Sequence, residues 1–331
     1  MMGFASRSAA VVTLWLAALT AGAGAMAVGA GRKTAEPAAA AAASRGGPQR
    51  GQGPTWRADG PAYGVYDPAR DFRDDRYVAI ESFYFPWQGG DLDWLRQVDG
   101  YAADRNRLLM VTLEPFSWTA REQEAPRRLR EDIVDGRYDA TIDRICAVVG
   151  GMKSPVWIRW GHEMERANGR YPWAGWWPSN YVAAYRHVVE RCRTSAPAAQ
   201  FVWSPRGDRG MGRYFPGRDY VDIVGVSLYG LEGYQEATQG RALDFVDSFR
   251  PLYDRLAAFD LPVIIAEVGY SGSEDYVRRW SEQIMRPNLA FPLLKAAVYF
   301  NARETGSWPL GFGQPDWRVY ANMTDGGGSD H

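Results

Sequence analysis

The sequence predicts one (β/α)8 barrel of the α/β class, and three observations lead to that prediction. From Tyr63 onward, eight short apolar runs rich in β-forming residues alternate with longer amphipathic stretches, which is typical of parallel strands joined by helices. The 331 residues are enough for one large domain and its core, but hardly for two full enzymatic domains. Polar and aromatic residues collect directly after the apolar runs, at the face where a barrel forms its active site.

The first 60 residues precede the predicted barrel. Residues 1–30 have the pattern of a signal peptide, with Arg7 before an apolar run at 9–19 and Ala25-Met26-Ala27 as a cleavage site. An uncleaved membrane anchor is the alternative, because residues 9–30 are nearly long enough to span a bilayer. Residues 31–60 are rich in Ala, Gly, Pro and Arg without apolar periodicity, which predicts a disordered linker. We therefore expect a secreted or periplasmic protein.

The barrel is predicted at residues 61–323, followed by a flexible tail at residues 324–331. Its strands are expected at residues 63–66, 77–85, 108–113, 156–160, 201–204, 223–228, 263–266 and 296–300. Helices are expected at residues 92–103, 138–149, 179–193, 242–259 and 273–285, with Ser179 and Ser273 as N-caps. A doubly wound sheet is the main competitor, but Gly64-Val65-Tyr66-Asp67-Pro68 is not the Gly-rich phosphate fingerprint of that fold. We therefore prefer the TIM barrel.

Composition and charge exclude several classes of function. The net charge of −1 argues against nucleic acid or an anionic membrane surface as the main partner, because such binding needs a basic patch. Cys146 and Cys192 lie in separate predicted helices and no Cys/His spacing resembles a metal site, so we expect neither a metal nor a cofactor. In an exported protein the pair could form one disulfide, but two separately buried thiols are equally compatible with the sequence. The 14 Trp, 18 Tyr and 13 Phe supply flat rings that suit the faces of sugars.

The residues after the predicted strands point to one chemistry. In chain order they are Asp67, Tyr84 to Trp87, Glu114, His162 and Glu163, Ser204 to Arg206, Tyr229, Glu267 and Asn301, with Trp308 beyond. Glu163 and Glu267 follow strands four and seven, so they project toward the centre of the mouth from roughly opposite sides. Glycoside cleavage needs one carboxyl to protonate the leaving oxygen and another to attack the anomeric carbon, about 5 to 5.5 Å apart in retaining enzymes. Burial beside Trp160 or Trp173, and the charge of Glu267, would raise the pKa of Glu163 as an acid requires.

Several segments of the predicted barrel also carry a family resemblance. They are Trp157-Ile158-Arg159-Trp160-Gly161-His162-Glu163-Met164, then Asn168-Gly169-Arg170-Tyr171-Pro172-Trp173, then the run from Tyr214 to Val226, and finally Ala266-Glu267-Val268-Gly269. In this order they resemble glycoside hydrolase family 26, which contains β-mannanases and some β-glucanases and xylanases. The resemblance spans most of the barrel.

The resemblance implies roles for the residues around the two glutamates. Glu163 would be the acid/base and Glu267 the nucleophile. His162 would hold the sugar or orient the acid, and Tyr229 would donate a hydrogen bond to Glu267, which favours the ionised carboxylate. Arg159 lies on the same strand face as Glu163, so we expect it deeper in the barrel, paired with a carboxylate. Glu114 ranks third among the carboxylates, and the candidate sugar platforms, each equally compatible with core packing, are Trp173, Trp87, Trp118 and Trp308.

Two departures from the family leave the substrate open. Glu165, Arg166 and Ala167 stand before Asn168, where the family often has Asn-Gly almost directly, and Ser227 stands where many mannan-active relatives place an acidic residue. We expect a monomeric, exported endo-β-glycanase that acts with retention on mannan, glucan, mixed-linkage glucan or the cell's own exopolysaccharide. Its mature domain would enter a membrane only if the N-terminal segment remained uncleaved. A non-catalytic glycan-binding barrel is the alternative.

Overall fold

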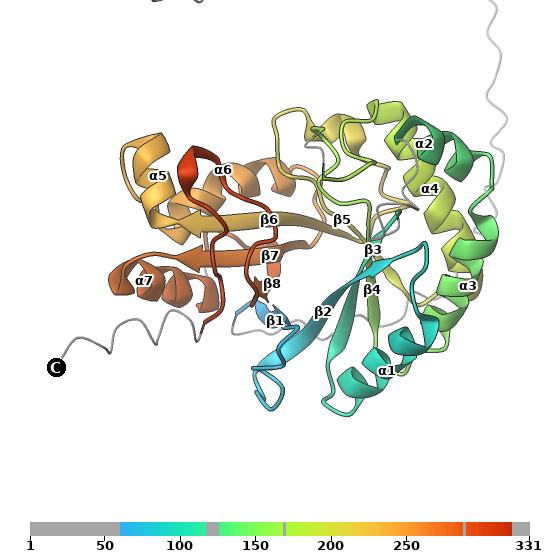
Figure 1. Ribbon diagram of the computed structural model, residues 1–331, viewed down its shortest axis with the longest axis horizontal. Coiled ribbons are helices and arrows are strands. Elements are labelled where there is room, and N and C mark those ends of the chain that lie inside the picture. The colour runs from blue at the N-terminus through green and yellow to red at the C-terminus, as the bar shows by residue number, and fades with distance from the viewer. Residues whose placement is uncertain (1–59, 117–125, 168–169, 287–288, 320–331) are drawn as a thin grey trace, which may run out of the picture. The chain divides into compact units, whose positions relative to one another are not determined.

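The computed structural model describes residues 60–116, 126–167, 170–286 and 289–319. In this part of the chain eight parallel strands form a closed barrel in sequence order, in which the last strand pairs with the first (Figure 1). The predicted barrel is therefore confirmed. The predicted signal segment, nearly all of the linker, Trp118 and the predicted tail lie outside the described residues, so these stay predictions.

All eight predicted strands are present. They are β1 (Ala62–Tyr66), β2 (Val78–Pro86), β3 (Leu108–Glu114), β4 (Val156–Trp160), β5 (Gln200–Trp203), β6 (Ile223–Leu231), β7 (Val263–Ser271) and β8 (Leu294–Phe300). Both β6 and β7 continue beyond their predicted ends, and Tyr229 pairs there with Gly269. Gly230 and Gly269 interrupt the apolar pattern because aromatic rings lie against them. A Cβ at Gly230 would meet Trp280 at 2.5 Å, and one at Gly269 would meet Trp317 at 2.9 Å.

The five predicted helices are present, together with two that the pattern did not predict, α2 and α5. They are α1 (Leu92–Ala103), α2 (Pro126–Val134), α3 (Asp139–Gly150), α4 (Pro178–Ser195), α5 (Glu232–Gln239), α6 (Phe245–Ala257) and α7 (Glu274–Met285), with 3-10 turns η2 (Met211–Tyr214) and η3 (Pro309–Gly311). The Ser273 hydroxyl accepts from the Tyr276 N–H, as an N-cap should. The predicted cap at Ser179 is wrong, because Pro178 begins α4 one residue earlier.

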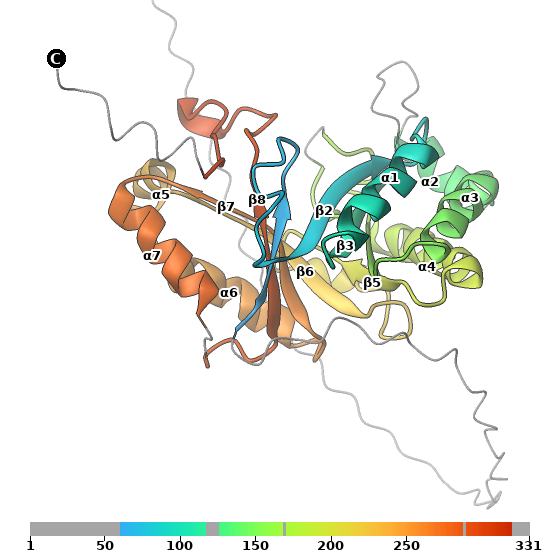
Figure 2. The same cartoon turned by 90° about the horizontal axis from the view of Figure 1, so that it is seen from below.

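Apolar side chains fill the barrel and also join it to the surrounding helices. The inner cluster takes residues from every strand: Ala62, Ile80, Leu108, Met110, Trp157, Val202, Ile223, Ile264, Ala266, Ala296 and Val298. A second, larger cluster lies between strands and helices. Figures 1 and 2 show α1, α3 and α4 on the side of β2 to β4, and α5 to α7 on the side of β6 and β7. Because the interior is packed, the barrel is not a pore, and a site must form at its mouth.

A disulfide joins Cys146 in α3 to Cys192 in α4, across a sequence separation of 46 residues. The open choice between a disulfide and two buried thiols is thereby decided in favour of the disulfide. The same two helices are joined by a hydrogen bond between the His187 ring and the Asp139 carboxylate at 2.6 Å. Among the described residues, no helix is both long and apolar enough to cross a membrane.

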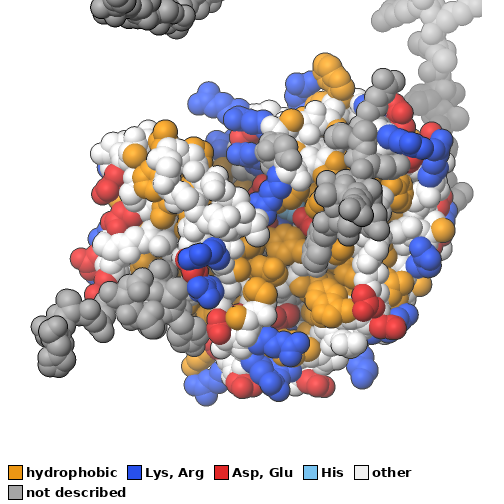
Figure 3. Space-filling model, in the orientation of Figure 1, with side chains coloured by type: hydrophobic (Ala, Val, Ile, Leu, Met, Phe, Trp, Pro, Cys, Tyr) orange, Lys and Arg blue, Asp and Glu red, His pale blue; other side chains and the backbone are white. Residues whose placement is uncertain are grey.

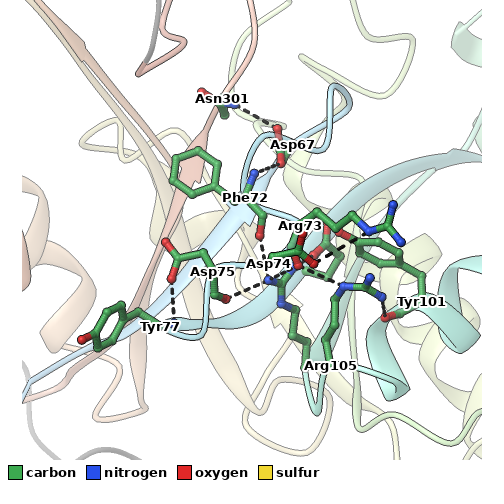
Figure 4. Close-up of polar contacts among 11 residues, drawn as sticks. Asp67, Phe72, Arg73, Asp74, Asp75, Tyr77, Tyr101, Arg105 and Asn301 are labelled. Atoms are coloured by element: carbon green, nitrogen blue, oxygen red, sulfur yellow. Dashed lines mark hydrogen bonds and ion pairs between the residues drawn. The ribbon is translucent and has the colours of Figure 1, made fainter. Parts of the chain in front are cut away.

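Two strand-end residues, Asp67 and Asn301, hold the loop between β1 and β2. The amide nitrogen of Asn301 donates to Asp67 at 2.9 Å, and the Phe72 N–H donates to Asp67 at 2.7 Å (Figure 4). The same amide nitrogen donates to Asp71 at 3.0 Å. The side chain of Asn301 also accepts from the Val319 N–H at 3.0 Å. These contacts use both side chains to close the barrel between its first and last strands.

Candidate active site

Glu163 lies in a tight turn directly after β4. The turn uses left-handed backbone at Gly161 (φ 54°) and again at Glu163 (φ 55°), a conformation that costs a non-glycine residue about 1–2 kcal/mol. The Glu163 N–H donates to the Ser204 carbonyl at 2.8 Å and the Gly161 N–H to the Leu113 carbonyl at 3.4 Å. The ends of both neighbouring strands therefore hold the turn, and Glu163 lines the cavity at the mouth.

Glu267 lies on β7 and also lines this cavity, with a donor on each carboxylate oxygen. The Arg159 guanidinium contacts Oε1 at 2.5 Å, and the Tyr229 hydroxyl donates to Oε2 at 2.6 Å. Arg159 is fully buried and also donates to the Ser227 hydroxyl at 3.2 Å. Arg159 is therefore paired with a carboxylate, and that carboxylate is Glu267 itself.

The pKa values of the two glutamates are shifted in opposite directions. Burial raises the pKa of Glu163, and the negative charge of Glu267 raises it further, against opposing effects of neighbouring donors and cations. Burial would also raise the pKa of Glu267, but the charge of Arg159 and the hydrogen bonds from Arg159 and Tyr229 outweigh it, so this pKa is lowered. One cavity thus holds a carboxyl suited to stay protonated and another suited to stay ionised.

The cavity has a volume of about 460 Å³ and combines charged groups with flat rings. It is lined by Glu163, Arg170, Tyr171, Arg206, Ser227, Tyr229, Glu267, Phe300, Glu304, Gly306, Ser307 and Trp308. Figure 3 shows hydrophobic side chains, tyrosine included, in the hollow at the middle of one face, with basic side chains beside it. Aromatic faces next to a few directed polar groups are typical of sites that bind sugars.

His162 lies fully buried beside Glu163, in contact with aromatic rings. Its ring meets Tyr171 edge to face at a centroid distance of 4.7 Å, and the Trp173 indole donates to its backbone carbonyl at 2.6 Å. Burial lowers the pKa of His162 well below its usual value, so the imidazole stays neutral. Neither ring nitrogen has a hydrogen-bond partner in the part of the chain that the structure describes.

The remaining predicted site residues are divided between the cavity and the core. Trp308 lines the cavity, 6.5 Å from the Tyr229 ring. Trp173 is fully buried under Tyr171, and Trp87 is buried against Tyr138, so neither ring lines the cavity. Glu114 is buried at the end of β3, and its charge adds to the larger effect of burial in raising the pKa values of Tyr66 and Tyr171.

Some aromatic residues of the site had no role assigned to them from the sequence, among them Tyr84 and Phe300. Tyr84, on β2, lies near Glu267 and helps to lower the pKa of that carboxyl, after the larger effects of Arg159 and Tyr229. Phe300, the last residue of β8, lines the cavity. Their positions near strand ends were the only sequence feature that could have predicted them. An aromatic residue at a strand end, however, can point either into the mouth of the barrel or toward the surrounding helices. Among the described residues, no group of three or more His, Cys, Asp or Glu side chains could hold a metal ion.

Comparison with known proteins finds similarity to carbohydrate-active enzymes. Residues 134–283 match the family described as Glycosyl hydrolase family 26. The chain is 27% identical over 255 residues to Endoglucanase H of Acetivibrio thermocellus. The matched segment is 72% of this chain and 27% of that protein. The chain is also 30% identical over 200 residues to the β-1,3-xylanase TXYA of a Vibrio species, with 54% of this chain and 42% of that protein covered. The chain thus matches less than half the length of either relative.

A solved structure shares the fold at low sequence identity. The Cellulomonas fimi endo-β-1,4-mannanase double mutant is similar with a TM-score of 0.58 and 15% identity, over 73% of this chain and 64% of that chain. The family match runs from the end of α2 into α7, so it includes the turn after β4, the Tyr229 strand and Glu267. The part of the chain that brings the two glutamates together is therefore the part that is similar to glycoside hydrolase family 26.

Proposed function

We propose that this protein is an endo-β-glycanase that hydrolyses a β-linked polysaccharide with retention of anomeric configuration. The observation that carries the proposal is the pair of glutamates in one cavity with pKa values shifted apart, upward for Glu163 and downward for Glu267. Retaining glycosidases need this division, because one carboxyl must give a proton while the other attacks as an anion.

In the first step, Glu267 attacks the anomeric carbon while Glu163 gives its proton to the departing glycosidic oxygen. The bond to the leaving sugar breaks, and an ester forms between Glu267 and the remaining sugar. Glu163, now ionised, then takes a proton from water as that water attacks the anomeric carbon and releases Glu267. Arg159 and Tyr229 hold the two oxygens of the Glu267 carboxylate in place, and they stabilise this carboxylate again when the ester is hydrolysed.

The proposal names a class of polysaccharide substrate and not a single glycan. The named relatives include an endoglucanase and a β-1,3-xylanase, and the structural neighbour is an endo-β-1,4-mannanase. Ser227 accepts a hydrogen bond from Arg159 and contacts Glu163, so an acidic residue at this position would add negative charge beside the proposed acid. A β-linked glucan, xylan or mannan is therefore the proposed substrate class, with chain-internal cleavage proposed from the relatives' endo action.

We also propose that the chain is exported and acts as a monomer on its polysaccharide. The N-terminal pattern of a signal peptide supports export. The disulfide between α3 and α4 supports it independently, because such bonds are rare in the reducing cytosol. Size-exclusion chromatography and N-terminal sequencing of the secreted protein test these two points.

Release of reducing ends from a panel of β-glucans, xylans and mannans tests the activity. The wild type should release them from at least one glycan, and Glu163→Gln and Glu267→Gln should each lose at least about 1000-fold in rate, as expected when a reacting group is removed. Glu236→Gln, on the exposed face of α5, is the matched control and should keep wild-type activity. Glycan binding without release by the wild type would instead identify a non-catalytic binding barrel.

A further inference from the structure

The carboxylate of Glu165, two residues after the proposed acid Glu163, joins the loops after β4 and β5. The side chain of Glu165 accepts hydrogen bonds from the backbone N–H groups of Arg206 at 2.8 Å, Gly207 at 3.0 Å and Asp208 at 3.3 Å. Glu165 belongs to the three residues that separate the His-Glu-Met motif from Asn168. The inserted residues therefore fix the loop after β5 as well as their own.

Further contacts hold this second loop in a single conformation. Gly207 has a left-handed backbone (φ 90°), and a Cβ there would meet Leu252 at 2.5 Å. Its carbonyl accepts from the Arg255 guanidinium at 2.8 Å, and Asp208 pairs with Arg166 at 3.3 Å. The backbone of Arg206 is thus positioned from both sides at the edge of the cavity.

The arginines at the cavity differ in whether their charge is already neutralised. Arg159 is paired with Glu267, and Arg170 contacts Glu304 at 3.3 Å. Arg206 lines the cavity with an exposed side chain that has neither a hydrogen bond nor an ion pair within the described residues. Its charge reaches Glu163, whose pKa it lowers slightly against the dominant effect of burial. Among the described residues, Arg206 is therefore a positive charge at the cavity without a partner, next to the group that would protonate the leaving sugar.

We propose that Arg206 binds a carboxylate on the sugar beside Glu163, so that the substrate is an acidic β-glycan, and that Glu165 is the residue that positions Arg206. This inference rests on the proposed function. A single unpaired cation suits a monoanion better than a doubly charged group, and the planar guanidinium fork matches the two oxygens of a carboxylate. A sugar acid or an acidic substituent on a neutral sugar supplies the same group.

The test uses one β-glycan that the full-length protein hydrolyses, prepared in a carboxymethylated and in a hydroxyethylated form of equal size. The measured quantity is the ratio of kcat/KM for the charged form to kcat/KM for the uncharged form. We expect this ratio to exceed one in the wild type and to fall about tenfold in Arg206→Gln, mainly through KM, because a charge-assisted contact is lost. Arg206→Lys keeps the charge and should retain part of the ratio.

Arg209→Gln is the matched control, because Arg209 is an exposed arginine on the same loop outside the cavity lining. It should keep the wild-type ratio, whereas Glu165→Gln should lower the ratio by releasing Arg206. An equal loss on both glycans in Arg206→Gln, or a wild-type ratio of one or less, overturns this inference alone. Hydrolysis of no β-glycan by the wild type overturns the proposed function instead, so the two failures are distinguishable.

Discussion

Glu163 and Glu267 are the same kind of side chain in the same cavity, yet their neighbours give them opposite properties. Glu267 has a guanidinium on one oxygen and a phenol on the other, which favours its ionised form. Glu163 is removed from water and lies near the negative charge of Glu267, and both effects favour its protonated form. The roles of the two residues therefore follow from Arg159 and Tyr229 more than from the glutamates themselves.

These shifts predict a bell-shaped dependence of kcat/KM on pH. Activity should appear as the pH rises through the lowered pKa of Glu267, because the nucleophile must be ionised, and disappear as it rises through the raised pKa of Glu163, because the acid must be protonated. With an aryl glycoside that needs no acid, Glu163→Gln should lose the alkaline limb and keep the acid limb. An alkaline limb that survives in this variant would contradict the assignment of Glu163.

Replacing Tyr229 tests the other limb of the profile. Tyr229→Phe removes the hydrogen bond to the ionised carboxylate, so the pKa of Glu267 should rise and the acid limb should move to higher pH. We expect kcat/KM on the acid side to fall about tenfold, which corresponds to about 1.4 kcal/mol. Tyr220→Phe removes an exposed phenol that is bonded to Glu190, and it should leave the profile unchanged. An acid limb that stays in place in Tyr229→Phe would show that the phenol does not tune Glu267.

At the scale of elements, apolar patterning predicted every strand, because alternation of buried runs with amphipathic stretches is a local property of the sequence. The two missed helices lack that signal in different ways. In α5 only Gln235 is buried among its eight residues, so it has no apolar stripe. In α2 most residues are charged, and Leu129 and Ile133 are the buried apolar residues among its described side chains, so its apolar stripe is short.

In the candidate site, too, residues whose position follows from the local sequence could be predicted, and those whose position depends on distant parts of the chain could not. Glu163 and Glu267 could be predicted because a carboxyl after a barrel strand faces the mouth by construction. The burial of Trp173 and Trp87 could not, because it depends on rings contributed by Tyr171 and Tyr138. The hydrogen bonds that Glu165 accepts from the loop after β5 could not be predicted either, because the donors are backbone N–H groups and no side-chain pattern indicates them.

The link between α3 and α4 gives a prediction on stability. Replacing Cys146 and Cys192 together by Ser should lower the free energy of unfolding by about 3–4 kcal/mol, because the disulfide closes a loop of 46 residues in the unfolded chain. Calorimetry of the full chain, before and after reduction, measures the change in Tm. The same Tm in the double variant as in the oxidised wild type would show that helix packing alone carries this interface.

On the scale of the whole molecule, barrel closure is what converts two distant strand ends into one site. Glu163 and Glu267 are far apart in sequence, and each gains its place from neighbours on other strands. The apolar filling below them is drawn from all eight strands, so the mouth is left for polar groups. The fold is shared with an endo-mannanase at only 15% identity, so the barrel alone does not choose the sugar. That choice belongs to the loops, including the one fixed by Glu165.

The covalent intermediate offers the most direct test of the central claim. A 2-deoxy-2-fluoro glycoside of the sugar that the substrate panel identifies, carrying a dinitrophenyl leaving group, should accumulate the ester. Fluorine slows both steps because it destabilises their positively charged transition states, and the activated leaving group restores the rate of the first step alone. Mass spectrometry of the digested protein should find the added sugar on the peptide that contains Glu267. The sugar on a peptide containing Glu163, or turnover of the glycan with no labelled peptide at all, would contradict the account.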